Sequence, residues 1–201
     1  MDRNGPAIFV GEWATREGGP TPNFGSALGD AAFMTSMERN SDLIKMASYA
    51  PLLVNVNPNG MQWESDLIGY DAMTSYGSPS YYAQVMFNKY LGDEILTGKS
   101  EGAGSRFFYS ATRTAATGTI HLKLVNGSST PKTMTIALDG ATKVAPTAKL
   151  VTLSAKTLGA TNTITTPTKI VPVDGTFKKA SGKFTYTIPG YSIQILELET
   201  K

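Results

Sequence analysis

The amino-acid composition of this 201-residue chain changes abruptly near residue 97, and the change divides the sequence into two parts. Seven of the eight methionines and both tryptophans precede residue 97, whereas 21 of the 25 threonines lie from residue 97 onward. Methionine suits the packed faces of helices, and threonine suits half-exposed strands. The segment 97–105 is rich in glycine and serine, which is typical of a connection. We therefore expect two domains, 1–98 and 99–201, with the boundary near 98–105.

The first part alternates predicted strands and helices. An apolar run at 7–10 predicts a strand buried on both faces of a parallel sheet, and residues 45–56 predict a second strand interrupted by Pro51. Asn23 is a suitable N-cap for a helix that runs to about residue 40, and Ser78-Pro79 is typical of the start of another. The residues expected to face the core are Phe24, Leu28, Ala31, Met34 and Met37 or Glu38 in the first helix, and Tyr82, Val85, Met86 and Tyr90 in the second. Two strands cannot cover their own edges, so we expect the closing pair of a barrel or doubly wound sheet; a small self-sufficient α+β domain is the alternative.

The second part predicts an antiparallel β-sandwich. Short strands are expected at 106–111, 119–126, 134–138, 148–153, 163–165, 183–188 and 191–198. In the strand 119–126, strict alternation predicts Ile120, Leu122 and Leu124 inward, with His121 and Lys123 outward.

Charge and composition exclude several classes of function. Residues 1–96 carry a net charge of −6 and residues 97–201 a net charge of +8, but the lysines of the basic part stand singly, without an arginine cluster. This spacing favours a solvated sheet surface over nucleic-acid binding. No apolar run approaches the roughly 20 residues of a membrane-spanning helix. With no cysteine, one histidine and no phosphate-binding loop, we expect neither a metal nor a cofactor, and any catalysis must use carboxylates.

Glu12 is the carboxylate best placed for chemistry, because it directly follows the first predicted strand. Functional groups of parallel α/β sheets and barrels lie at the carboxyl ends of strands. The alternative is a structural role, with Glu12 anchoring the loop through backbone amides or an ion pair with Arg16. Asp66 and Asp71 lie in a later loop, where a solvated position is the more common outcome.

Three other side chains fall near the ends of the two predicted strands. Trp13 and Trp63 are suited to stacking on a sugar, although a tryptophan at a domain junction is as often part of a core. Asn55 either donates a hydrogen bond to a ligand hydroxyl or fixes the turn at Asn57.

Several motifs resemble one family of glycosidases. They are Phe9-Val10-Gly11-Glu12-Trp13-Ala14, residues 20–28, Glu38-Arg39-Asn40-Ser41-Asp42, residues 48–57, residues 63–71, Leu124-Val125-Asn126-Gly127, Thr161-Asn162-Thr163-Ile164 and residues 189–196. Together they span nearly the whole chain, which is similar to the last part of the α-L-arabinofuranosidases of glycoside hydrolase family 51.

The resemblance implies the final two β/α units of an incomplete (β/α)₈ barrel, followed by a β-sandwich. It implies a retaining mechanism with Glu12 as the nucleophile, acting on terminal α-L-arabinofuranosyl units of arabinan or arabinoxylan. It suggests Trp13, Trp63, Asn55 and Tyr49 as substrate contacts. The family's acid/base glutamate lies in an Asn-Glu pair, and this sequence contains no such pair. We therefore expect a fragment that is nearly inert alone.

The resemblance leaves the compartment and the oligomeric state of a full-length enzyme open. Two other functions remain as alternatives. Residues 105–201 would act as a non-catalytic module that binds glycan or docks to a barrel, or the enzyme would be a related barrel glycosidase of another specificity.

Overall fold

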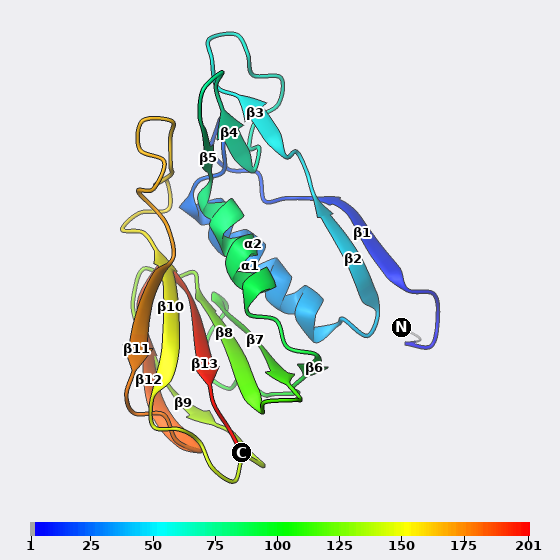
Figure 1. The fold of residues 1–201 in the computed structure, drawn as a ribbon, viewed down its shortest axis with the longest axis vertical. Helices are drawn as coiled ribbons and strands as arrows, with labels where there is room; N and C mark the ends of the chain where they lie inside the picture. The colour runs from blue at the N-terminus through cyan, green and yellow to red at the C-terminus, as the bar shows by residue number, and fades with distance from the viewer. Residues whose placement is uncertain (1–2) are drawn as a thin grey trace.

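The computed structural model describes residues 3–201, and its first half contains two helices and five short strands (Figure 1). In chain order these are β1 (Ile8–Trp13), α1 (Phe24–Arg39), β2 (Ile44–Tyr49), β3 (Leu53–Asn55), β4 (Ile68–Tyr70), β5 (Ser75–Gly77) and α2 (Pro79–Lys89).

Strands β1 and β2 form a parallel pair connected through α1, as the sequence predicts. Their register places Glu12 beside Ser48 and Trp13 beside Tyr49. The prediction that β1 is buried on both faces is wrong, because Phe9 is 58% exposed and Met46 on β2 is 64% exposed. Within residues 3–201, this sheet has only two strands, and Phe9 and Met46 are exposed on it.

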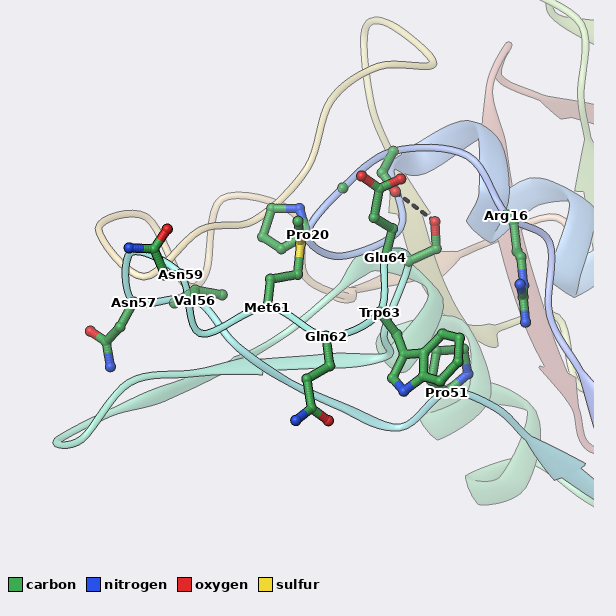
Figure 2. Close-up of a pocket in the computed structure, with 13 residues that line it drawn as sticks. Arg16, Pro20, Pro51, Val56, Asn57, Asn59, Met61, Gln62, Trp63 and Glu64 are labelled. Atoms are coloured by element: carbon green, nitrogen blue, oxygen red, sulfur yellow. Dashed lines mark hydrogen bonds between the residues drawn. The ribbon is translucent and has the colours of Figure 1, made fainter.

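The predicted strand over 45–56 is two strands that belong to different sheets. The chain leaves β2 at the Ala50–Pro51 bond and continues as β3, which pairs with β4 in a small sheet of order β3-β4-β5. Proline cannot continue a strand ladder because it lacks a backbone N–H. Strands β4 and β5 were not predicted, since each has only three residues. The loop between β3 and β4, residues 56–67, is shown in part in Figure 2.

Both helices begin where the sequence predicts. The Asn23 side chain accepts a hydrogen bond from the Ser26 N–H at 3.0 Å, and the Ser78 hydroxyl accepts one from the Tyr81 N–H at 3.1 Å. The predicted inner positions of α1 are buried or packed on the core, whereas Val85 of α2 is 39% exposed. Met86 and Tyr90 are buried and Tyr82 packs on the core, as predicted, while Ala83 and Phe87 complete this face.

The second half forms a six-stranded sheet of order β11-β10-β13-β8-β7-β6 and a two-stranded sheet of β12 and β9. The strands are β6 (Glu94–Ile95), β7 (Phe107–Thr114), β8 (Thr119–Asn126), β9 (Lys132–Ala137), β10 (Ala148–Ser154), β11 (Val173–Phe177), β12 (Lys183–Ile188) and β13 (Ser192–Leu198). An apolar core containing Leu122, Phe184 and Leu196 lies between the sheets, so the predicted β-sandwich-like arrangement is confirmed. The strand expected at 163–165 is instead a turn, closed by a bridge between Thr163 and Thr166, and β11 was not foreseen.

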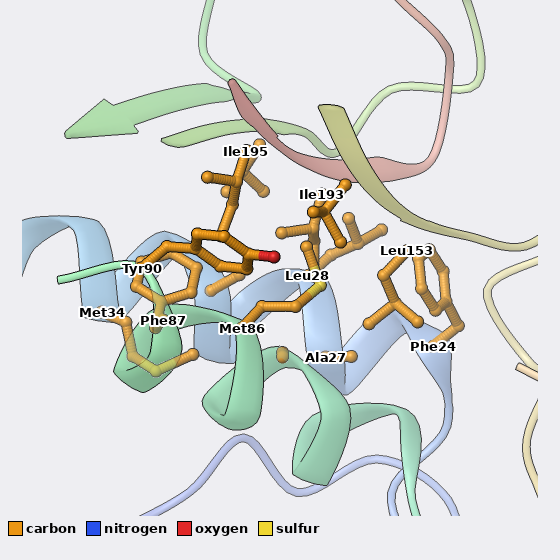
Figure 3. Packing of buried hydrophobic residues seen from close by; sticks show 14 of the residues in the cluster. Phe24, Ala27, Leu28, Met34, Met86, Phe87, Tyr90, Leu153, Ile193 and Ile195 are labelled. Carbon is orange, nitrogen blue, oxygen red and sulfur yellow. The ribbon is translucent and has the colours of Figure 1, made fainter. Parts of the chain in front are cut away.

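A second core joins the helices of the first half to the six-stranded sheet (Figure 3). Phe24 and Met86 from the helices pack with Leu153, Ile193 and Ile195 from the sheet. The helices therefore cover the sheet face that the sequence analysis expected to be solvated.

This covering overturns the prediction that His121 and Lys123 face solvent. His121 is 8% exposed and Lys123 is fully buried. Lys123 forms an ion pair with Glu38 of α1, and its ammonium lies 5.0 Å from the centre of the Phe87 ring. Strand β8 is therefore buried on both faces, against the sandwich core on one and against the helices on the other.

Candidate functional site

Glu12 lies near the carboxyl end of β1 with an exposed side chain. It lines a hollow of about 520 Å³, here called the Glu12 hollow. The other lining residues are Trp13, Ala14, Thr15, Arg16, Phe33 and Ala50. The two structural alternatives for Glu12 are not observed, because its carboxylate has neither a backbone amide partner nor an ion pair to Arg16 within residues 3–201. A free carboxylate at the mouth of a hollow is available to a ligand.

Aromatic side chains form one wall of the Glu12 hollow. The Trp13 ring lies 5.2 Å from the Phe33 ring and 5.3 Å from the Tyr49 ring, centre to centre. These contacts hold the indole in a defined orientation. The Trp13 Nε1–H is buried and has no hydrogen-bond partner in the described chain, so its donor is unused. Trp13 thus belongs to the core on one side and to the hollow on the other.

Tyr49 lies behind Trp13 and reaches Asp30 rather than the hollow. Its hydroxyl donates to Asp30 Oδ2 at 3.5 Å, and Asp30 Oδ1 accepts the Thr15 N–H at 2.8 Å. Burial raises the pKa of both Tyr49 and Asp30, so the phenol keeps its proton near neutral pH. Sequence reasoning missed Asp30. The available signal was an acidic residue in α1 directly before Ala31, a position expected to face the core.

A second and larger hollow of about 960 Å³ adjoins the first. It is defined here as the Trp63 hollow (Figure 2). Its lining residues are Arg16, Gly18, Gly19, Pro20, Pro51, Val56, Asn57, Asn59, Met61, Gln62, Trp63, Glu64 and Ser65. Arg16 lines both hollows, so the two share a wall. The structure thus brings Trp13 to the Glu12 hollow and Trp63, which is 66% exposed, to its neighbour.

Asn55 fixes the turn that follows β3. Its Oδ1 accepts the Asn57 N–H at 3.0 Å, which is the local role that the sequence analysis considered beside ligand binding. Asn55 and Tyr49 line neither hollow.

Asp66 is buried, whereas the sequence analysis favoured a solvated position. It is 1% exposed, and neither carboxylate oxygen has a hydrogen-bond partner in the part of the chain that the structure describes. Burial raises its pKa to about 6, opposed by the charge of Arg16. Asp71 behaves differently, because its Oδ1 accepts the N–H groups of Met73 and Thr74 at 2.8 and 2.6 Å, which lowers its pKa.

Replacing Asp66 with asparagine is expected to stabilise the chain at neutral pH. A carboxyl group whose pKa is raised on folding contributes most to the stability of the folded state below about pH 4. This contribution is lost as the pH rises to about 6. At pH 7 the ionised Asp66 should cost about 2 kcal/mol, or roughly 4–8 °C in the unfolding midpoint. Thermal unfolding of both proteins between pH 4 and 7 measures the difference, which should grow with pH.

Asp71→Asn is the matched control. It should lower stability at pH 7, because an amide oxygen accepts the hydrogen bonds of the Met73 and Thr74 N–H groups more weakly than an ionised carboxylate does. A difference between wild type and Asp66→Asn that does not change with pH would contradict this account of Asp66.

Residues 3–201 contain no group of three or more histidine, aspartate or glutamate side chains arranged to hold a metal ion. No helix in the same range is long and apolar enough to cross a membrane.

Comparisons with known proteins agree with one another. The model of the alpha-L-arabinofuranosidase C-terminal domain family matches residues 11–192. The chain is 34% identical over 198 residues to alpha-L-arabinofuranosidase A of Aspergillus kawachii, covering 98% of this chain and 30% of that protein. It is 32% identical over 203 residues to alpha-L-arabinofuranosidase 1 of Arabidopsis thaliana, with coverages of 98% and 30%.

Among solved structures, an arabinose-bound GH51 α-L-arabinofuranosidase matches with a TM-score of 0.92 and 34% identity. The match covers 100% of this chain and 34% of that one. The chain spans about 30% of the length of the curated relatives, as their C-terminal part. The sequence similarity, the family match and the shared fold show that this chain belongs to the C-terminal domain family of the GH51 α-L-arabinofuranosidases.

Proposed function

We propose that this chain supplies the nucleophile, Glu12, of a retaining α-L-arabinofuranosidase. The observation that carries the proposal is the free Glu12 carboxylate beside a hollow of about 520 Å³, near the carboxyl end of a parallel strand. The proposed substrates are terminal non-reducing α-L-arabinofuranosyl residues of arabinan or arabinoxylan. The names of the relatives, alpha-L-arabinofuranosidases, support the arabinofuranosyl unit and name no polymer.

The proposed fold of residues 1–98 is the last two β/α units of a (β/α)₈ barrel, with residues 99–201 as the appended sandwich. The parallel β1–α1–β2 connection followed by α2 supports this arrangement. So does the uncovered face of β1: Phe9 is 58% exposed, and a Cβ added at Gly11 would meet no atom within 4 Å. Further barrel strands and their side chains would cover these positions.

In the proposed reaction, a Glu12 oxygen attacks the anomeric carbon of arabinose while the bond to the leaving oxygen breaks. A second carboxyl group, about 5–5.5 Å from the nucleophile, protonates that oxygen. The same group then takes a proton from water, and the water oxygen displaces Glu12 with net retention of configuration. In the described chain, no second carboxylate lines the Glu12 hollow, so the acid/base group has to come from outside these residues.

The aromatic wall has a distinct role in this proposal. The Trp13 face would contact the apolar side of the sugar ring, and Tyr49 would act through Trp13 and Asp30, which it touches. Asn55 would act on the Trp63 hollow instead, by holding the turn at Asn57, which lines that hollow.

A chimera tests the proposal. In it, this chain replaces the matching C-terminal part of the Aspergillus kawachii relative. We expect the purified chain alone to release no p-nitrophenol from p-nitrophenyl α-L-arabinofuranoside above the buffer rate, because half of the carboxylate pair is missing. The chimera should turn the substrate over. Thermal unfolding of the chimera shows whether it is folded. Turnover by the isolated chain that Glu12→Gln abolishes, or a folded but inert chimera, would contradict the proposal.

A further inference from the structure

We propose that Asp30 is a positioning residue for the Glu12 hollow. From helix α1 it holds together the chain at the carboxyl ends of strands β1 and β2, and so fixes the wall beside Glu12. The inference deepens the proposed function. Its effect on turnover rests on that function, whereas its effect on the wall does not. The reaction itself assigns Asp30 no part, because Asp30 lines neither hollow.

The two carboxyl oxygens of Asp30 contact both strand ends. Oδ1 accepts the Thr15 N–H at 2.8 Å, just beyond the end of β1, and Oδ2 accepts the Tyr49 hydroxyl at 3.5 Å, at the last residue of β2. Asp30 is fully buried. Removing its carboxyl group would leave the Thr15 N–H without this acceptor and the Tyr49 hydroxyl without its contact, and an unpaired buried donor is costly. The chain at both strand ends therefore depends on Asp30 for its position.

Both partners of Asp30 contribute to the wall of the Glu12 hollow. Thr15 lines the hollow itself, in the segment that directly follows Glu12. The Tyr49 ring packs edge-on against the Trp13 indole, with the ring centres 5.3 Å apart, and Trp13 lines the same hollow. Asp30 thus supports one lining residue through its backbone and a second through an aromatic neighbour.

Gly29, the preceding residue of α1, shows how closely the helix approaches this segment. A Cβ atom added at Gly29 would lie 2.8 Å from Thr15 Oγ1 and 3.1 Å from Thr15 Cγ2, both shorter than ordinary side-chain contacts. Thr15 therefore packs directly against the helix at Gly29 while its N–H bonds to Asp30. A displacement of about 1 Å near reacting groups can lower a rate about 100-fold, so this packing matters for turnover.

Tryptophan fluorescence of the full 201-residue chain tests the effect on the wall. Trp13 and Trp63 are its two tryptophans, so the variant Trp63→Phe reports on Trp13 alone. In this background we expect Asp30→Ala to shift the emission to longer wavelength and to increase quenching by acrylamide. The reason is that the Tyr49 ring loses its hydrogen bond and packs less firmly on the indole.

Asp93→Ala is the matched control. Asp93 Oδ1 also accepts a backbone N–H at 2.8 Å, from Ala115, but Asp93 lines neither hollow. This variant removes the same kind of bond and should leave the Trp13 emission unchanged.

The chimera tests the effect on turnover. Asp30→Ala should lower kcat by about 10- to 100-fold. Asp30→Asn keeps an oxygen for the Thr15 N–H, so it should retain most of the wild-type kcat and emission. Gly29→Ala keeps Asp30 and gains helix propensity, but its methyl group displaces Thr15, so it should lower kcat in a protein that remains folded. Thermal unfolding of each variant shows whether it is folded.

Three results would overturn the inference. The first is the same Trp13 emission in Asp30→Ala as in Asp93→Ala. The second is an Asp30→Asn variant as impaired as Asp30→Ala, which would show that the charge of Asp30 is required rather than its position. The third is a folded Gly29→Ala chimera with the wild-type kcat. Failure of the proposed function is distinguishable, because a chimera that stays active in Glu12→Gln would exclude the nucleophile and leave the emission results standing.

Discussion

Replacing Glu38 with alanine is expected to lower the free energy of unfolding by about 3–5 kcal/mol, because it leaves a buried ammonium group without its counter-charge. Lys123 is fully buried, and its ammonium group donates a hydrogen bond to Glu38. Glu38 also accepts a hydrogen bond from the Ser110 hydroxyl, at 2.5 Å. For a chain of this length, the unfolding midpoint should fall by roughly 10 °C. Thermal unfolding followed by circular dichroism measures the shift.

Two variants make this prediction specific. The double variant Glu38→Leu with Lys123→Met should recover most of the stability, because an apolar pair can replace a buried ion pair at little cost. Glu94→Ala breaks the Arg113–Glu94 pair, whose side chains are 43% and 44% exposed, and it should cost less than about 1 kcal/mol. A Glu38→Ala variant as stable as Glu94→Ala would show that the Glu38–Lys123 ion pair does not stabilise the packing of the helices on the sheet.

Replacing Glu12 with glutamine in the chimera is expected to lower kcat by about 10⁴-fold or more, because the amide cannot form the glycosyl ester. The free energy of unfolding should change little, since Glu12 is exposed and its carboxylate has no hydrogen bond within residues 3–201. Steady-state hydrolysis of p-nitrophenyl α-L-arabinofuranoside measures the loss. Glu17→Gln is the control, because Glu17 is also an exposed glutamate of this segment but lines neither hollow.

The loss in Glu12→Gln should be in kcat. In the truncated variant Glu12→Ala, which leaves space for an anion, added azide should restore part of the activity by attacking the anomeric carbon in place of the missing carboxylate. A variant that keeps more than a few per cent of the wild-type rate would exclude Glu12 as the attacking group.

Local signals were sufficient to predict both helices. The N-caps Asn23 and Ser78 and the proline at position 79 act through their own backbone neighbours, so their effect can be read from a few consecutive residues. The position of Glu12 at a strand end was also predicted locally, from the apolar run that precedes it.

The failures of prediction have non-local causes. Alternation in β8 indicated one solvated face, but α1 covers that face with Glu38, which is 85 residues from Lys123 in the sequence. Asp66 looked like a solvated loop residue, yet its backbone N–H donates to Pro20 across the fold and its side chain is buried. Arg16 was considered only as a partner for Glu12, because no periodic pattern reveals that it lines two hollows.

Covalent trapping tests the role of Glu12 most directly. The chimera is incubated with an arabinofuranosyl compound whose 2-hydroxyl is replaced by fluorine and which carries a good leaving group, so that the glycosyl ester forms faster than it is hydrolysed. Peptide mass spectrometry then locates the sugar. The account predicts one adduct, on the side chain of Glu12, whereas an adduct on any other carboxylate of an active chimera would contradict it.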